Sequence, residues 1–428
     1  MAHQTLRPGY DSLVDRINRF PQGAPPSPLL YKILNILFSE KEAELVAKLP
    51  IKPFDVHRAA QVWQKPVAEA QKILDELAGR ALLVDIEDES GKSVYVLPPP
   101  MAGFFEFSMM RTRGDIDQHL LAQLFYQYCN EEEDFIKNLF VKGETQLGRV
   151  FVNESVLAKE DDAHVLDYER ASEVIRTSPQ MGVSICYCRS KMQHMDRACD
   201  APLDICMTFN ASAGSLIKHG FARSVDVAEG LDLLDQAYEH NLVQFGENCR
   251  QGVNFICNCC GCCCEAMLAA KRFGLLHPIH TTNFMPEIDY DRCTTCGKCV
   301  TACPVEAMGL VSANDPKNPK RKKAHVHTDI CLGCGVCARS CPEQAISMRS
   351  REKRVITPLN STHRCVVMAL ERGKLQNLIF DNHVLWSHRA LAAVLGVVLK
   401  LPGVKQVMAL KQVKSRYLEY VITHFYRG

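Results

Sequence analysis

Two runs of cysteine near residue 300 have the residue types and the spacing to hold metal. Each run reads C-x2-C-x2-C-x3-C-P: CTTCGKCVTACP at Cys293–Pro304 and CLGCGVCARSCP at Cys331–Pro342. The two-residue gaps let a tight loop present three thiolates from one side, and the proline keeps the fourth cysteine from rejoining that loop. A cubane of iron and sulfide needs four such thiolates. Structural zinc sites also use C-x2-C pairs, but they do not require four cysteines in one run.

The runs lie in a repeat with a period of 38 residues, in which DRCTTCGKCVTACPVEAMGL from Asp291 matches DICLGCGVCARSCPEQAISM from Asp329. This segment, residues 284–350, resembles bacterial ferredoxins that carry two [4Fe–4S] clusters. The resemblance implies a ferredoxin-like fold, transfer of single electrons and an exchange of iron ligands between the two runs. One cluster would bind to Cys293, Cys296, Cys299 and Cys341, and the other to Cys331, Cys334, Cys337 and Cys303.

Eleven further cysteines lie in the central region, between residues 186 and 264. The string ICYCRSKMQHMDRACDAPLDIC contributes Cys186, Cys188, Cys199 and Cys206; Cys249 stands alone; FICNCCGCCCEAM contributes Cys257, Cys259, Cys260, Cys262, Cys263 and Cys264. Thiolates this dense repel one another unless they are protonated, bridged or bound to metal, and only metal satisfies all of them in a reducing cell. We therefore expect one further iron–sulfur cluster here, with room for two.

Even two cubanes would leave three of the eleven cysteines spare. The spare thiols could support the ligands, face a substrate or bind a cluster larger than a cubane. Free cysteine is also a small buried hydrophobe, and this interpretation is favoured for Cys129, Cys249 and Cys365.

The two strings follow short apolar segments that we expect to be strands, Gly182–Ile185 and Val253–Ile256. Each strand end would deliver a C-x-C pair into one cavity. A helix running through Ala266–Ala270 would then place Cys260, Cys263, Cys264 and Met267 on one face, at spacings of three and four residues. A helix N-terminus would also stabilise the charge of thiolates or of a cluster.

Composition limits the class of protein. The chain of 428 residues has a net charge of +1, so its total charge selects no partner, and its first 128 residues contain none of the 21 cysteines. Cysteines in adjacent pairs and triples cannot all bridge one another, so a secreted disulfide scaffold is not expected. The N-terminus has no apolar leader and no stretch reaches 18 apolar residues. These features predict a cytoplasmic, reduced protein from an anaerobic setting.

The order of elements predicts an α+β multidomain protein with four parts. Residues 1–100 form an arm and a winged-helix-like domain, 101–283 a cysteine-rich α/β central domain, 284–350 the ferredoxin-like domain, and 351–428 a basic helical C-terminal segment. The first part resembles a winged helix because apolar-periodic helices at 29–48, 56–62 and 67–77 precede a hairpin of strands 81–87 and 93–97.

A winged helix invites a DNA-binding interpretation, which the charges do not favour. The candidate recognition helix balances Lys65, Lys72 and Arg80 against as many acidic residues, and the wing IEDESGKS is acidic. A DNA-binding face needs surplus lysine and arginine to displace counterions from phosphates. We therefore expect a docking or structural module rather than a nucleic-acid partner.

Two other segments are strongly basic. From Thr362 onward the chain has ten lysines or arginines against three acidic residues, and this segment could lie on the inner face of a membrane or form a core-facing helix pair. The run KNPKRKK, Lys317–Lys323, falls between the two cysteine runs and could steer an acidic redox partner or be a solvated loop.

The function we predict is electron transfer. The chain has no G-x-G-x-x-G or P-loop motif, hence no sign of a dinucleotide or nucleotide site, and no catalytic residue can be assigned. The protein would relay single electrons through two ferredoxin-type clusters and at least one more cluster, to or from a larger oxidoreductase. The alternatives are a reductase whose active site is the central cluster, and a redox-sensing regulator that uses the winged helix.

Overall fold

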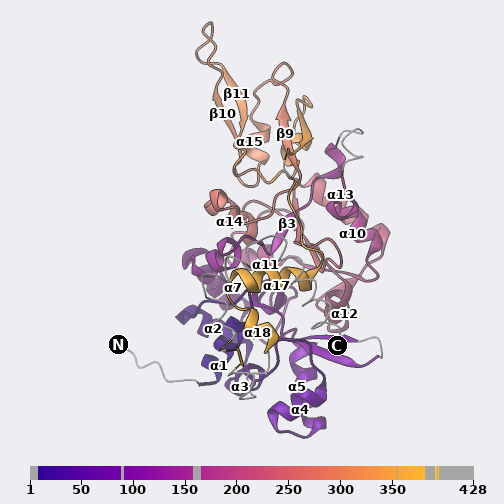
Figure 1. Ribbon diagram of the computed structural model, residues 1–428. Helices are drawn as coiled ribbons and strands as arrows, with labels where there is room; N and C mark the ends of the chain where they lie inside the picture. The colour runs from indigo at the N-terminus through magenta and orange to yellow at the C-terminus, as the bar shows by residue number, and fades with distance from the viewer. Residues whose placement is uncertain are drawn as a thin grey trace. The chain divides into compact units, whose positions relative to one another are not determined.

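The computed structural model describes residues 8–87, 91–157, 165–352, 354–380, 391–392 and 394 (Figure 1). The protein is a mixed helix and sheet structure, with 45% helix and 15% strand and a ferredoxin-type domain near the C-terminus. It divides into two compact units. Unit 1 comprises residues 1–145, 214–222 and 361–428, and unit 2 comprises residues 146–213 and 223–360. No helix among the described residues is long and apolar enough to cross a membrane.

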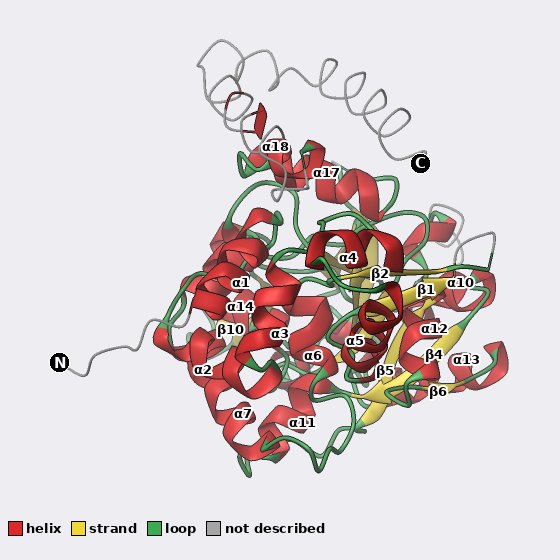
Figure 2. Ribbon diagram, turned by 90° about the horizontal axis from the view of Figure 1, so that it is seen from below, coloured by secondary structure: helices red, strands yellow, loops and turns green. Residues whose placement is uncertain are grey.

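Unit 1 begins with five helices and a hairpin (Figure 2). The helices are α1 (Pro8–Arg19), α2 (Pro28–Leu37), α3 (Glu40–Ala47), α4 (Val56–Trp63) and α5 (Val67–Gly79), and the hairpin pairs β1 (Val84–Glu87) with β2 (Ser93–Val96). Ser39 and Glu42 form a capping box at α3, and Asp55 caps α4, which fixes where each helix starts. The predicted order of helices and hairpin is therefore present, and the winged-helix assignment itself stays a prediction.

The rest of unit 1 is helical and less regular than expected. The apolar pattern of the sequence predicts one helix over residues 116–141, whereas the structure has α7 (Gln118–Tyr126), a wide turn at Gln127–Glu131, α8 (Asp134–Ile136) and a second wide turn at Lys137–Val141. The break falls at Glu133, whose φ of 13° is incompatible with a helix. At the other end, the apolar pattern of the sequence predicts helices at 361–377 and 388–425. In place of the first, the structure has α17 (Ser361–Glu371) and α18 (Leu375–Ile379), because Gly373 has a positive φ. The basic helix predicted at 388–425 lies almost wholly outside the described residues.

Unit 2 is built on an antiparallel sheet of six strands in the order β3-β7-β8-β5-β4-β6. These are β3 (Gly148–Val150), β7 (Val243–Glu247), β8 (Phe255–Cys259), β5 (Asp204–Phe209), β4 (Met181–Ile185) and β6 (Arg223–Ser224). Helices α10 (Ala171–Thr177) and α13 (Val227–Glu239) lie side by side (Figure 1) and pack with alternate strand residues into one apolar core.

That alternation leaves the cysteines on the other face of the sheet. Met207 and Phe209 of β5 and Ile256 of β8 belong to the core beneath the two helices. Because successive strand residues point to opposite faces, Cys206 and Cys257 must point away from this core. The sheet therefore has one apolar face and one face that carries thiols.

The ferredoxin-type part of unit 2 repeats its elements at the 38-residue period. Strand β9 (Phe284–Ile288) pairs with β12 (Ile346–Ser350), and β10 (Met308–Ser312) pairs with β11 (Lys322–Val326). Short helices α15 (Lys298–Ala302) and α16 (Val336–Arg339) follow the second cysteine of each run. Their apolar residues share one core with the cysteines.

Candidate metal centres

Both cysteine runs near residue 300 adopt the same loop backbone. Gly297 and Gly335, directly after the second cysteine of each run, have positive φ, and so do Thr295 and Gly333 two residues earlier. A side chain at Gly333 would place Cβ 2.1 Å from the Phe284 carbonyl oxygen, so only glycine fits there. These left-handed residues curl each loop so that its cysteines face inward.

The second run brings its cysteines together with the last cysteine of the first. Cys303, Cys331, Cys334 and Cys337 line one cavity of about 310 Å³. Burial raises the pKa of Cys334 to about 12 and that of Cys337 well above the ordinary value, and nearby thiolates, Cys303 among them, add to both shifts. Buried thiols that repel one another suit a cationic metal that neutralises them.

The exchanged cysteines Cys303 and Cys341 have matching surroundings. The Ala307 amide donates to Cys303 Sγ at 3.1 Å, and the Ala345 amide donates to Cys341 Sγ at 3.3 Å. Amide hydrogen bonds to sulfur stabilise the anionic form of an iron–sulfur site. The two halves of the repeat therefore prepare their fourth cysteine in the same way.

Residues 286–348 match the family model of the 4Fe-4S dicluster domain. No curated protein and no solved structure matches the chain. The dicluster domain supports [4Fe–4S] cofactors and iron–sulfur electron transfer. The thiols described above fit that cofactor, since the cavity holds the four cysteines that the ligand-exchange pattern assigns to one cluster.

Outside the dicluster domain, six cysteines of the central region form a closed ring, which we call the six-thiol ring. Each thiol lies close enough to two others to perturb their pKa, in the order Cys186, Cys188, Cys264, Cys259, Cys257, Cys206 and back to Cys186. The contact between Cys264 and Cys259 is 3.1 Å. The ring members come from the end of β4, from β5 and β8, and from the first residues of two helices, α11 (Tyr187–Gln193) and α14 (Glu265–Phe273).

Protonation alternates around the six-thiol ring. Hydrogen bonds from neighbouring thiols lower the pKa of Cys257 and Cys264 to about 5 and that of Cys186 well below its ordinary value. The same bonds raise the pKa of the three thiols in between. The ring can therefore carry several negative charges inside the protein, which is the character of a metal-ligand set.

Four other cysteines, Cys199, Cys260, Cys262 and Cys263, form a second set that we call the four-thiol group. Their Sγ atoms all lie within 4.8 Å of one another, and Cys262 is exposed to solvent. The separations are 3.7 Å from Cys262 to Cys263 and 3.9 Å from Cys263 to Cys199. Thiolates around a single tetrahedral zinc, with Zn–S of about 2.3 Å, would lie about 3.8 Å apart, so this group suits zinc as well as iron.

Arg189 lies between the two sets. Its side chain is only 1% exposed, and Nη1 donates to the Asn258 carbonyl oxygen at 3.1 Å, whereas Nε and Nη2 have no hydrogen-bond partner. Burial alone would lower the pKa of Arg189, but ring thiols and Cys260 of the four-thiol group raise it above the ordinary value. One buried cation thus faces the anionic groups of both sets.

The four-thiol group also borders the dicluster domain. A Cβ at Gly261 would lie 2.5 Å from the Pro304 carbonyl oxygen, so the turn that carries Cys260 and Cys262 packs directly on the residue after Cys303. Lys271 of α14 pairs with Glu306 of the same dicluster turn at 3.1 Å. The thiols of the two regions are therefore held next to each other through backbone contact.

A buried ion pair joins the two helices that begin at the six-thiol ring. Lys191 of α11 contacts Glu265 of α14, and these side chains are 0% and 3% exposed. Each partner lies close in sequence to a ring cysteine, Cys188 and Cys264 respectively. The pair therefore fixes the relative position of two ring members from outside the ring.

The structure corrects the prediction that Cys260, Cys263 and Cys264 share a helix face. Helix α14 begins only at Glu265, with Cys264 in extended conformation (φ −70°, ψ 126°) as its N-cap. Helical spacing therefore does not apply across this boundary, and Cys264 joins the six-thiol ring while Cys260 and Cys263 join the four-thiol group. The predicted strand 253–256 is also shifted, because β8 runs over Phe255–Cys259 and includes two ring cysteines.

The three remaining cysteines belong to none of these thiol sets. Cys249 lies in the apolar core, Cys129 is buried in unit 1, and Cys365 lies on α17.

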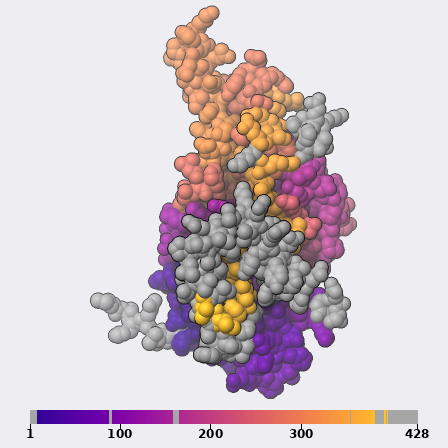
Figure 3. All heavy atoms as spheres, viewed as in Figure 1, coloured from indigo at the N-terminus to yellow at the C-terminus, as the bar shows by residue number. Residues whose placement is uncertain are grey.

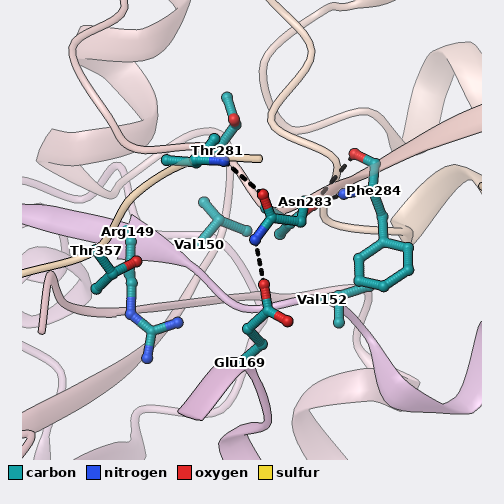
Figure 4. A pocket seen from close by; sticks show the side chains of 10 residues that line it. Arg149, Val150, Val152, Glu169, Thr281, Asn283, Phe284 and Thr357 are labelled. Carbon is teal, nitrogen blue, oxygen red and sulfur yellow. Dashed lines mark hydrogen bonds between the residues drawn. The ribbon is translucent and has the colours of Figure 1, made fainter. Parts of the chain in front are cut away.

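A pocket of about 290 Å³ is lined by Arg149, Glu169 and Asn283, among others (Figure 4). In this pocket the Asn283 side chain donates a hydrogen bond to Glu169 and accepts one from the Val355 amide at 2.6 Å. The polar groups of Asn283 therefore anchor the segment that leads into β9.

The basic run lies at the tip of the β10–β11 hairpin, which projects from the dicluster domain (Figure 3). Residues 316–322 are exposed, and residues 313–323 contain five basic side chains against one acidic residue, Asp315. Asp315 pairs with Arg321 at 3.3 Å, which leaves a strongly positive surface. Such a surface attracts acidic partners.

Proposed function

We propose that the protein relays single electrons between redox partners through the two clusters of the dicluster domain and a third iron–sulfur cluster bound by the four-thiol group. The observation that carries this proposal is the contact of Gly261 with Pro304. It brings the four-thiol group next to Cys303, a ligand of one dicluster cluster by the exchange pattern. Electron tunnelling weakens steeply with distance, so centres held in backbone contact can exchange electrons directly.

The partner would be an acidic redox protein that docks on the β10–β11 hairpin. The five basic side chains of residues 313–323 support this assignment, since opposite charge raises the rate of encounter. The helices and hairpin of residues 28–96 would be a winged-helix-like docking module of the same protein.

Metal counting on anaerobically purified protein tests the third cluster. We expect at least about twelve irons per chain, with matching sulfide and little zinc. Cys262→Ala should remove about four of them and leave the dicluster signals in the EPR spectrum of the reduced protein unchanged. The matched control is Cys129→Ala, which removes a buried cysteine that lies outside both thiol sets.

One equivalent of zinc that disappears in Cys262→Ala would instead show a structural zinc site, as the sulfur separations also allow. That result would remove the third cluster from the relay and leave the dicluster domain as its only iron–sulfur part. Eight irons in wild type, with no zinc, would show that the four-thiol group binds no metal.

A further inference from the structure

The six-thiol ring is a site of its own, separate from the four-thiol group. Its members come from three neighbouring strands, β8, β5 and β4, and from the two helices that follow β4 and β8. The ring closes without a gap, because every member contacts two others and none contacts only one. No subset of four is set apart from a remaining pair, so all six belong to one site.

Six ligands are the wrong number for ordinary cubanes. A single [4Fe–4S] cubane has one open position on each iron and takes four thiolates, and two separate cubanes take eight. Two cubanes that share one bridging sulfide have two of their eight positions filled by that sulfide. Six positions are then left for protein thiolates, which is the number that the ring supplies.

The width of the ring argues against mononuclear and binuclear zinc. Zinc thiolate sites place four sulfurs at the corners of a small tetrahedron, with edges of about 3.8 Å. Over the residues that the structure describes, the four-thiol group is the one set of three or more ligand atoms that all lie within 4.8 Å of one another. The six-thiol ring does not meet this limit, and neither do the two cysteine sets of the dicluster domain. The ring therefore lacks the compact spacing of sulfurs around a single tetrahedral zinc.

Buried polar groups without partners point at the ring. Two of the guanidinium nitrogens of Arg189 have no hydrogen-bond partner although the side chain is 1% exposed, and Arg189 lies beside Cys186 and Cys206. Ser184 is 3% exposed, its hydroxyl has no partner, and it stands directly opposite Cys206 in the β4–β5 ladder, on the face that carries the thiols. Buried donors are rarely left unpaired, and the sulfides of a large anionic cluster would accept from both.

We propose that the six-thiol ring binds one iron–sulfur centre of more than four irons, built as two cubane halves joined by a shared sulfide. Cys186, Cys188, Cys206, Cys257, Cys259 and Cys264 are its ligands. Arg189 and Ser184 donate hydrogen bonds to its sulfides. The four-thiol group contacts the dicluster domain at Gly261 and shares Arg189 with the ring, so it would link the large centre to the dicluster clusters.

Native mass spectrometry of the anaerobic holoprotein tests the proposal without any substitution. The heaviest species should contain about twenty irons: eight in the dicluster domain, four in the four-thiol group and eight in the ring. If the four-thiol group binds zinc, the count is about sixteen irons with one zinc. Either composition supports an eight-iron ring centre. About sixteen irons without zinc support it if Cys262→Ala still contains about sixteen, because the four-thiol group is then empty, and overturn it if Cys262→Ala contains about twelve. About twelve irons or fewer in wild type would also overturn it.

Variants separate this proposal from the third cluster of the relay. Cys206→Ala should remove about eight irons and keep the metal of the four-thiol group, whereas Cys262→Ala should remove only the latter. Cys249→Ala is the matched control, since it removes a buried central cysteine that belongs to the apolar core. A loss of four irons or fewer in Cys206→Ala, or a loss of zinc, would show that the ring holds a smaller centre. If Cys206→Ala does not fold, the iron counts of wild type and Cys262→Ala decide together.

Discussion

Removing the positive charge of Arg189 should shift the reduction potentials of both central centres. The guanidinium is buried between the six-thiol ring and Cys260 of the four-thiol group, and two of its nitrogens have no partner in the protein. A reduced cluster carries one more negative charge than the oxidised cluster. A nearby cation therefore stabilises the reduced form, and Arg189→Met should lower both potentials.

The size of the shift follows from Coulomb's law. A charge at roughly 6 Å, in surroundings with an effective dielectric constant of about 20, changes the energy of an added electron by roughly 3 kcal/mol. Since about 1.4 kcal/mol corresponds to about 59 mV for a one-electron couple, the expected decrease is on the order of 100 mV. Arg189→Lys keeps the charge and should shift the potentials by a small fraction of that value.

Redox titration followed by EPR measures each centre separately. The dicluster signals should move little in Arg189→Met, because Arg189 faces the two central sets. Arg176→Met, which removes an exposed arginine of α10, is the control for a change in net charge alone. Equal shifts of all signals, or unchanged central signals with full metal content, would refute the view that Arg189 balances cluster charge.

Four other perturbations test the contacts around the centres. Gly261→Val should slow electron exchange between the four-thiol group and the dicluster domain, measured by flash photoreduction, because its side chain collides with the dicluster backbone. Lys191→Met should destabilise the protein by about 3–5 kcal/mol in chemical unfolding, since it leaves the Glu265 carboxylate buried, and adding Glu265→Leu should restore most of the loss. Lys320→Glu on the β10–β11 hairpin should slow reduction by a small acidic ferredoxin about threefold at low salt, and the difference should vanish near 1 M salt. Burial lowers the pKa of Lys374 to about 8, so between pH 8 and 10.5 the folded protein has lost a proton that the unfolded chain keeps. The free energy of unfolding should therefore rise with pH across this window. Lys374→Met should increase it by roughly 2 kcal/mol at neutral pH and by little above pH 10.

Controls distinguish these effects from general damage. Gly79→Ala adds a Cβ that meets nothing within 4 Å, so it should leave electron exchange unchanged. Lys41→Glu reverses an exposed charge on unit 1 and should not alter the salt dependence of reduction. A Lys191→Met protein as stable as wild type would show that the pair does not hold the two helices together. A melting temperature of Lys374→Met that follows wild type at every pH would contradict the role of burial.

The dicluster domain was predictable because its chemistry is local. Four cysteines within one run set the loop, the proline sets where it ends, and the 38-residue repeat shows that two such loops form one unit. The family match at residues 286–348 agrees with this prediction, and the structure places β9 to β12 at the same period. The longest-range link within that segment is the exchange of Cys303 and Cys341, which the repeat itself implies.

The partition of the central cysteines was not predictable because it depends on the order of strands in the sheet. Cys206 and Cys257 lie 51 positions apart and meet only because β5 and β8 are neighbours, with Met207 opposite Ile256. In the string of six, helical spacing suggested one face for Cys260, Cys263 and Cys264, whereas the helix starts after them. The boundary at Cys264 decides which thiols go to the ring and which to the four-thiol group.

One signal in the sequence could have revealed the thiol face. In DICMTF, the apolar residues Ile205, Met207 and Phe209 alternate with Cys206 and Thr208, which is the pattern of a strand with an apolar face and a second, different face. The apolar partners lie in buried cores. Since a face that faced water would carry charged residues, cysteine in those positions indicates a second buried layer, and a dense cluster of thiols in such a layer is typical of a metal site. The same alternation occurs in FICNC, where Ile256 faces the core and Cys257 and Cys259 face away from it. Both strands therefore present their cysteines on the same face of the sheet, where the six-thiol ring forms.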